Sequence, residues 1–123
     1  MVLTENIKKI DARWMNEVLE CAELVDNSKD DFLDSIIVFG SVARKESSQS
    51  SDIDFFLTYN CDIMDENFII QNDIIKSKIE ISRKLFKSNR RADFIFSNLI
   101  DKESTLYKNI LKDGIKVYER SKS

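Results

Sequence analysis

Two aspartates separated by one residue, Asp52 and Asp54, are the first candidates for chemistry in this sequence of 123 residues. The run from Asp52 to Tyr59 has the alternation of a β-strand, in which residues two apart point to the same side. Both carboxylates would then share one face, where they repel each other unless a proton or a cation lies between them. A hard cation such as Mg²⁺ takes oxygen ligands and keeps phosphate oxygens in its shell. Taken alone, the pair is more typical of an exposed acidic start of a strand, or of Asp52 acting as a cap.

A glycine and a serine, Gly40 and Ser41, follow an apolar, β-branched run that predicts a buried strand over 35–39. Glycine at this place lets the backbone turn sharply and approach a ligand. The free amide groups of a helix start bind anions, and the serine hydroxyl adds a donor for a phosphate oxygen. On its own, the dipeptide is also typical of a plain turn.

A third aspartate, Asp93, stands in the otherwise apolar run 92–96, within a strand predicted over 91–96. A carboxylate buried there without a partner would be costly, and a metal shared with the first acidic pair would provide that partner. The alternative is a carboxylate at the mouth of the strand, paired with Arg90 or Arg91.

The composition excludes several kinds of chemistry. The chain contains no histidine, which excludes serine–histidine and cysteine–histidine catalysis within it. Cys21 and Cys61 lie far apart and do not have the spacing of a zinc site, so we expect buried, reduced thiols. The net charge of −3 does not indicate general binding to nucleic acid, and no apolar run approaches the roughly 20 residues that span a bilayer.

The elements that must position these residues begin with an amphipathic helix predicted over 4–27, with Thr4 as its N-cap. Its apolar stripe consists of Ile7, Ile10, Trp14, Val18, Cys21 and Val25. A second long helix is predicted over 65–88, with one stripe of Ile70, Ile74, Ile81 and Leu85 and another of Phe68, Ile75, Ile79 and Phe86. Either both stripes form one wide buried face, or the second docks a partner or another copy of the chain.

A last helix through 106–111 should end at Gly114, where a left-handed C-cap is expected, and a short edge strand should follow over 115–118. Helices and strands therefore alternate along the chain. This order indicates an α/β (α+β) fold in which a mixed sheet of three to four strands packs against helices.

The order of these features is more specific than any one of them. The runs 40–44 (Gly-Ser-Val-Ala-Arg) and 51–54 (Ser-Asp-Ile-Asp), followed by a long helix and Asp93, resemble the signature of the minimal nucleotidyltransferases. These belong to the DNA-polymerase-β-like superfamily, and the closing run 110–118 also resembles that family's ending. The resemblance covers nearly the whole chain and implies a single nucleotidyltransferase domain over 1–123.

The resemblance implies a role for each aspartate. Asp52 and Asp54 would ligate the catalytic metal, Mg²⁺ or Mn²⁺. Asp93 would complete the metal site and help to activate the attacking hydroxyl as a general base.

The resemblance also implies a phosphate-binding segment. Gly40 and Ser41 would bind the β and γ phosphates of ATP, and Arg44 would contact phosphate or orient the loop. Lys45 is a departure, because the family usually has glycine at this position. A lysine adds positive charge near the phosphates. It would also stiffen or reshape the loop, which argues against efficient catalysis.

The implied activity is transfer of AMP from ATP to a hydroxyl, with release of pyrophosphate. Small stand-alone members of the family resemble the antitoxin of HEPN–MNT toxin–antitoxin pairs, and this resemblance implies a tyrosine of a partner HEPN toxin as the acceptor. Relatives that modify aminoglycosides or extend polynucleotides carry extra domains, for which we expect no room in this chain.

Two alternatives stay open at this point. One is a binding module that neutralises a partner protein by contact with little or no transfer, for which Lys45 is the sequence support. The other is a nucleotidyltransferase of small molecules, similar to the aminoglycoside enzymes. In each case we expect a cytoplasmic protein that contacts no membrane, and nucleic acid only through its partner.

Overall fold

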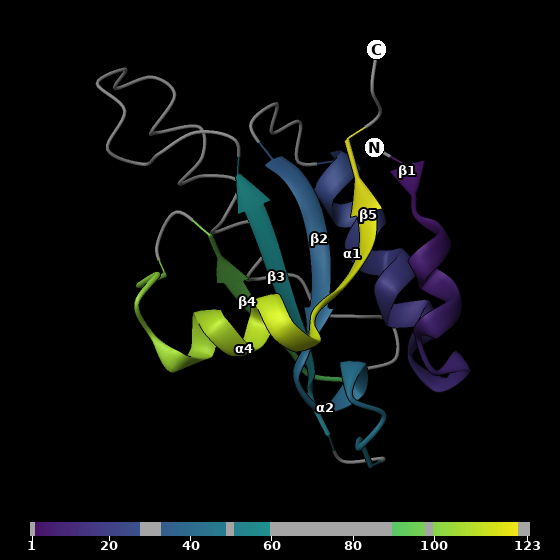
Figure 1. Cartoon of the computed structure of the whole chain (residues 1–123). Coiled ribbons are helices and arrows are strands. Elements are labelled where there is room, and N and C mark those ends of the chain that lie inside the picture. Colours follow the sequence, from purple (N-terminus) through teal and green to yellow (C-terminus); the bar gives the residue numbers. More distant parts are fainter. Residues whose placement is uncertain (1, 28–32, 49–50, 60–89, 98–99, 121–123) are drawn as a thin grey trace.

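The described part of the computed structural model comprises residues 2–27, 33–48, 51–59, 90–97 and 100–120 (Figure 1). Within it, five strands form one mixed sheet in the order β1-β5-β2-β3-β4. Their bounds are β1 Val2–Leu3, β2 Leu33–Phe39, β3 Ile53–Tyr59, β4 Ala92–Phe96 and β5 Ile115–Glu119. β3 and β4 are parallel, and the other neighbouring pairs are antiparallel. The expected α+β fold with a mixed sheet is confirmed.

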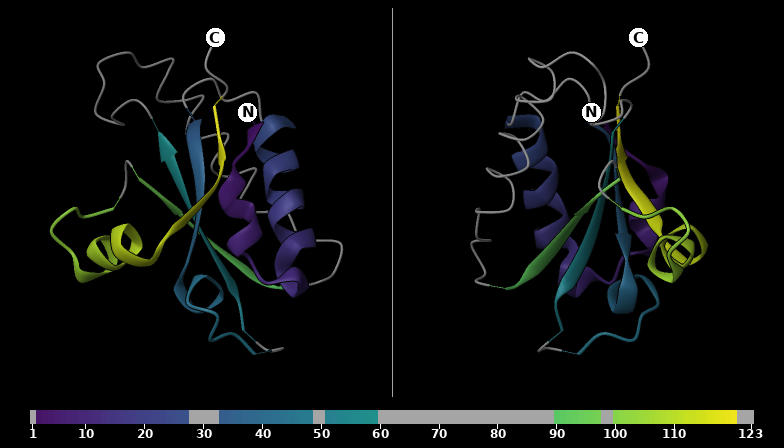
Figure 2. Two further views of the ribbon diagram at one scale, coloured as in Figure 1. Left: turned by 45° about the vertical axis from the view of Figure 1, so that its right-hand side comes forward. Right: turned by 90° about the vertical axis from the view of Figure 1, so that its left-hand side faces the viewer.

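Helices cover both faces of this sheet. The helix α1 (Met15–Asn27) lies on one face, together with the 3₁₀ turns η1 (Glu5–Lys9) and η2 (Ala12–Trp14), and α4 (Thr105–Asp113) lies on the other (Figure 2). A four-residue helix, α2 (Gly40–Ala43), follows β2 at the end of the sheet where β3 begins. No helix of the described residues is long and apolar enough to cross a membrane.

The predicted helix over 4–27 is regular only in its second half. Its first half consists of two 3₁₀ turns, and Asp11 caps the second of them by accepting a hydrogen bond from the backbone N–H of Arg13. The Thr4 hydroxyl caps no helix and donates instead to the carbonyl of Lys116. The predicted stripe is nevertheless buried, because 3₁₀ and α-helices repeat at similar intervals. Its buried members are Ile10, Trp14, Val18, Cys21 and Val25.

Alternation along β3 divides the core between the two faces of the sheet. Ile53, Phe55 and Leu57 pack into the large cluster with the apolar stripe of α1. Phe56 packs on the opposite face with Ile110 of α4. The acidic residue between Ile53 and Phe55 therefore has to point away from the main core.

Three expectations about the sheet and the end of α4 were incomplete or wrong. The sheet has five strands, and not three to four, because the N-terminal residues pair with β5 as β1. For the same reason β5 is an interior strand and not an edge strand. Gly114 has φ −66° and ψ 142°, which is not a left-handed cap. Glycine is required there because a Cβ would lie 2.4 Å from the carbonyl oxygen of Ile110. The predicted helix over 65–88 and Cys61 lie outside the described residues.

Candidate active site

Strand pairing brings the glycine turn and two of the aspartates together. Asp54 on β3 lies opposite Phe39, the last residue of β2, in the antiparallel pair. On its other side, Asp54 is in register with Asp93 of the parallel strand β4. Gly40 follows Phe39 directly, so Asp54 lies between the turn after β2 and the third aspartate, at the end of the sheet where α2 lies (Figure 1).

Gly40 and the Asp54 carboxyl group are in direct contact. Gly40 has φ +73°, in the left-handed region that favours glycine. A Cβ on residue 40 would lie 2.3 Å from Oδ2 of Asp54. Two independent reasons thus require glycine at this position, the backbone conformation and the space that the carboxyl group occupies.

The site disfavours negative charge on Asp54. Burial raises the pKa of Asp54 from its ordinary 3.8 to about 6, and the charge of Asp93, a side-chain hydrogen bond with Asp93 and the charge of Asp52 act in the same direction. The nearby guanidinium of Arg44 opposes this shift. A hydrogen bond between two carboxyl groups requires a proton on one of them, so the pair needs a proton or a cation between its oxygens.

These oxygens fit a divalent cation in chemical type. Asp54 is partly buried, whereas Asp93 is exposed near the start of β4, as expected for a carboxylate at the mouth of the strand. Asp52 is close enough to act on Asp54 through its charge. Within the described residues, however, no three carboxylates or thiolates are gathered closely enough to enclose an ion. The arrangement is an open acidic pair of hard oxygen donors, with a third donor beside it, which suits Mg²⁺ that keeps waters or phosphate oxygens.

Backbone hydrogen bonds hold the chain after Gly40 in a compact turn. The carbonyl of Ser41 accepts from the N–H of Glu46 at 2.8 Å, and the carbonyl of Gly40 accepts from the N–H of Arg44 at 3.1 Å. The exposed side chain of Arg44 pairs with Glu46, with Nε 3.1 Å from Oε2. Ser41 and Arg44 thus stand on the turn that adjoins Asp54, where the sequence predicted a phosphate-binding segment.

Lys45 adopts a backbone conformation that disfavours lysine. Its φ is +59°, in the left-handed region, and its side chain is exposed. The family's usual glycine at this position is thereby explained, since glycine adopts such angles without a steric penalty. The turn keeps this left-handed conformation with lysine at position 45, despite the steric penalty of the side chain.

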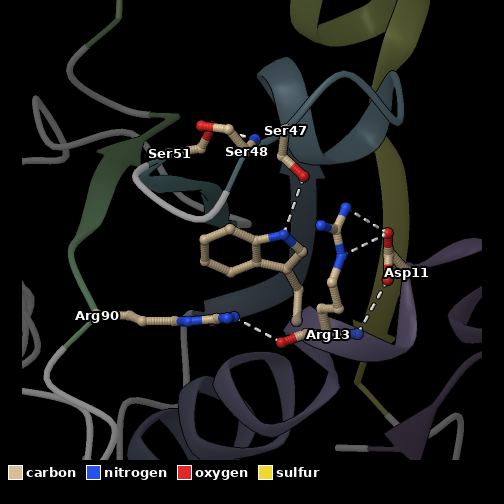
Figure 3. A network of polar contacts seen from close by, with 7 residues as sticks. Asp11, Arg13, Ser47, Ser48, Ser51 and Arg90 are labelled. Atoms are coloured by element: carbon tan, nitrogen blue, oxygen red, sulfur yellow. Dashed lines mark hydrogen bonds and ion pairs between the residues drawn. The ribbon is translucent and has the colours of Figure 1, made fainter.

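A polar network beside the site was not foreseen from the sequence (Figure 3). The indole Nε1 of Trp14 donates to the hydroxyl of Ser47 at 3.0 Å. The guanidinium of Arg90 lies over the indole ring, 4.2 Å from its centroid, and one of its nitrogens is 3.7 Å from Oε1 of buried Glu17. The apolar stripe indicated that Trp14 is in the core, but no sequence pattern indicated Ser47 or Arg90 as its partners.

A mixed sheet with aspartates on two parallel strands beside a glycine–serine turn is the arrangement expected of a polymerase-β-like nucleotidyltransferase. The family described as "Polymerase beta, Nucleotidyltransferase" matches residues 20–123, and the chain belongs to this family. No curated protein matches the sequence.

Solved structures share the fold. A toxin–antitoxin crystallised with AMP-PNP superposes with a TM-score of 0.60 at 15% identity, covering 84% of this chain and 73% of that chain. A mutant of the toxin–antitoxin MntA-HpeT gives a TM-score of 0.59 at 13% identity, with the same coverage. A candidate nucleotidyltransferase from Sulfolobus solfataricus gives 0.54 at 21% identity, covering 100% of this chain and 96% of that chain. The chain is therefore a polymerase-β-like nucleotidyltransferase that resembles the MntA antitoxin in fold.

Proposed function

We propose that this protein transfers AMP from ATP to a hydroxyl group in a reaction that depends on Mg²⁺ or Mn²⁺. The observation that carries the proposal is the position of Asp54, which lies against Gly40 on one side and is in register with Asp93 on the other. The crystallisation of a relative of this fold with AMP-PNP supports an adenine nucleotide as the donor.

Asp52, Asp54 and Asp93 would hold the divalent ion. When bound, the ion would supply positive charge to the phosphate oxygens, where negative charge develops during the displacement. Asp93 is exposed, so an acceptor hydroxyl can reach its carboxylate. The hydroxyl oxygen attacks the α-phosphorus, and its proton passes to Asp93. The bond from the α-phosphorus to the bridging oxygen breaks, and pyrophosphate leaves with that oxygen.

The turn after β2 would bind the triphosphate. Gly40 presents no side chain, and Ser41 adds a hydroxyl donor next to it. Arg44 and Lys45 are exposed cations on the same turn, and Arg44 can exchange Glu46 for a phosphate oxygen.

We further propose that the acceptor is a tyrosine on a partner toxin of the HEPN type, which would give the protein an antitoxin role. The support is that two structures with this fold are toxin–antitoxins, one of them a mutant with two aspartates, two positions apart, replaced by glutamate. That spacing is also the spacing of Asp52 and Asp54.

A second candidate is an antitoxin that acts by contact alone. The left-handed conformation of Lys45 favours it, because a strained turn is a weaker phosphate site than one with glycine. Titration calorimetry separates the two candidates, since the contact-only protein would bind its partner without binding ATP.

The test of the proposed activity is transfer of label from α-labelled ATP to the candidate toxin in the presence of Mg²⁺ or Mn²⁺. The variants are Asp54→Asn and Asp93→Asn, and the matched control is Asp34→Asn, an exposed aspartate on β2. Label on a toxin tyrosine, lost in both site variants and kept in the control, supports the proposal. Undiminished transfer by Asp54→Asn would refute the assigned site.

A further inference from the structure

We propose that Trp14 is a positioning residue for the nucleotide site, which holds the turn that follows α2 at a fixed place relative to the start of β4. This inference rests on the proposed function, because the turn is the segment assigned to the triphosphate. Trp14, in the N-terminal segment, would thus affect nucleotide binding although its side chain touches no substrate.

The indole N–H of Trp14 points to the turn that follows α2 and not to its own helix. The side chain is only 1% exposed, at the junction of η2 and α1. A buried indole N–H needs an acceptor, and the acceptor of Trp14 is the hydroxyl of Ser47, 33 positions further along the chain. This hydrogen bond joins the N-terminal segment to the turn that follows α2.

Ser47 is well placed to transmit this restraint. The residue before it, Glu46, donates its N–H to the carbonyl of Ser41 at 2.8 Å. The residue after it, Ser48, donates its N–H to the hydroxyl of Ser51 at 2.7 Å, and Ser51 directly precedes Asp52. Fixing Ser47 therefore restrains both the start of the proposed phosphate-binding turn and the approach to the first two aspartates.

The same indole also holds the start of the strand that carries Asp93. Arg90 stacks over the ring and donates from a guanidinium nitrogen to the carbonyl of Arg13 at 2.5 Å (Figure 3). The next residue, Arg91, accepts a hydrogen bond at its carbonyl from the N–H of Ile53 at 3.1 Å, which begins the pairing of β4 with β3. Trp14 thus contacts both segments that converge on the acidic pair.

The competing explanation is that Trp14 only fills the core. In that case Trp14→Phe would lower stability without a specific effect on nucleotide, and Ser47→Ala would change nucleotide binding no more than any other substitution in the turn. The two explanations therefore differ at Ser47, which lies outside the core cluster.

The experiment compares Trp14→Phe, Ser47→Ala and the double variant. Ser48→Ala is the matched control, because it keeps the backbone N–H that donates to Ser51 and removes the longer contact of 3.3 Å between the two hydroxyl groups. KM for ATP, kcat and the thermal midpoint are measured for each. Loss of one hydrogen bond is expected to raise KM roughly twofold to tenfold in both single variants, with kcat changed less. The double variant should be no worse than Trp14→Phe alone, because both changes remove the same contact. Ser48→Ala should behave as the wild type.

Two kinetic outcomes would overturn the proposal while leaving the proposed function intact. One is a wild-type KM in Ser47→Ala, and the other is multiplicative effects in the double variant.

Trp14 is the single tryptophan of the chain, so acrylamide quenching reports on its burial. Low quenching in Ser47→Ala is expected; strong quenching would mean that Ser47 holds the indole, and would also overturn the proposal. Absence of ATP binding to the wild type in calorimetry would instead overturn the proposed function, and this inference with it.

Discussion

The Asp54 carboxyl group occupies the space that any side chain on residue 40 would need, since a Cβ on Gly40 would lie 2.3 Å from Oδ2 of Asp54. The glycine and the aspartate come from adjacent strands, β2 and β3, whose pairing sets Phe39 opposite Asp54. The close approach of turn and acid is therefore a property of the sheet, and each residue constrains what the other can be.

Gly40→Ala tests this relationship. Alanine would have to adopt φ +73° and would displace the carboxyl group, so we expect a loss of at least about 1 kcal/mol in the free energy of unfolding and a severe loss of nucleotide transfer. Denaturant unfolding and label transfer measure the two effects. If Gly40→Ala matched the wild type in both, the described contact would be wrong.

Lys45→Gly should make the protein more stable. The lysine sits at φ +59°, and its replacement relieves the left-handed conformation, with a gain of up to about 1 kcal/mol after the larger backbone entropy of glycine is subtracted. The matched control is Arg44→Gly, because Arg44 has φ −82° and glycine gains nothing there, so this neighbour should lose about 0.5–1 kcal/mol. Equal effects at both positions would contradict the assigned backbone angles. Increased label transfer by Lys45→Gly would mean that Lys45 weakens transfer in the wild type, and it would therefore support the contact-only candidate.

The pKa of Asp54 predicts a specific dependence of stability on pH. In the folded protein without metal, the pKa of this carboxyl group is raised from 3.8 to about 6, so between these values the native state holds a proton that the unfolded chain releases. Stability should therefore fall as pH rises through this window, because the native state binds more protons than the unfolded state. The thermal midpoint of the wild type relative to Asp54→Asn, measured without divalent ions, should decline across it.

Mg²⁺ should reverse this decline, because a cation between the carboxylates replaces the proton and favours their ionised form. The stabilisation by Mg²⁺ should accordingly be small below the window and full above it. The Asp54→Asn variant should show little stabilisation at any pH. A Mg²⁺ effect that is the same in this variant and in the wild type would place the ion elsewhere.

Phe55→Ala tests the parallel pair that aligns the acids. Phe55 is fully buried and stacks on Phe94 of β4, with ring centroids 5.6 Å apart. Removing its ring should cost about 3–5 kcal/mol of unfolding free energy, whereas the partly buried Phe94 should cost less when changed to alanine. Denaturant unfolding of the two variants gives the comparison, and a larger loss for Phe94→Ala would contradict the described packing.

Much of the fold followed from local sequence patterns. The apolar alternation around Asp54 predicted β3 and which of its residues enter the main core, and this is confirmed. The helical stripe ending at Val25 was confirmed as well, although the 3₁₀ turns before α1 were not foreseen. Local patterns are informative here because burial on one face dictates the residue period.

The remaining features depend on contacts between distant segments. β1 forms only because Val2 and Leu3 pair with β5 at the other end of the sequence, and no local signal marks a strand of two residues. Arg90 was a candidate partner for Asp93, but it stacks on Trp14, which is 76 positions earlier in the chain. The candidate aspartates and the glycine turn could be named from the sequence, whereas their register and the network around Trp14 could not.

The most direct test of the central claim is calorimetric titration of ATP into the protein with and without Mg²⁺, using the wild type, Asp54→Asn and the control Asp34→Asn. Saturable binding that requires Mg²⁺ is expected in the wild type and in the control, and Asp54→Asn should lose that binding. Binding of equal strength in Asp54→Asn, or no Mg²⁺-dependent binding in the wild type, would contradict a nucleotide site at Asp54.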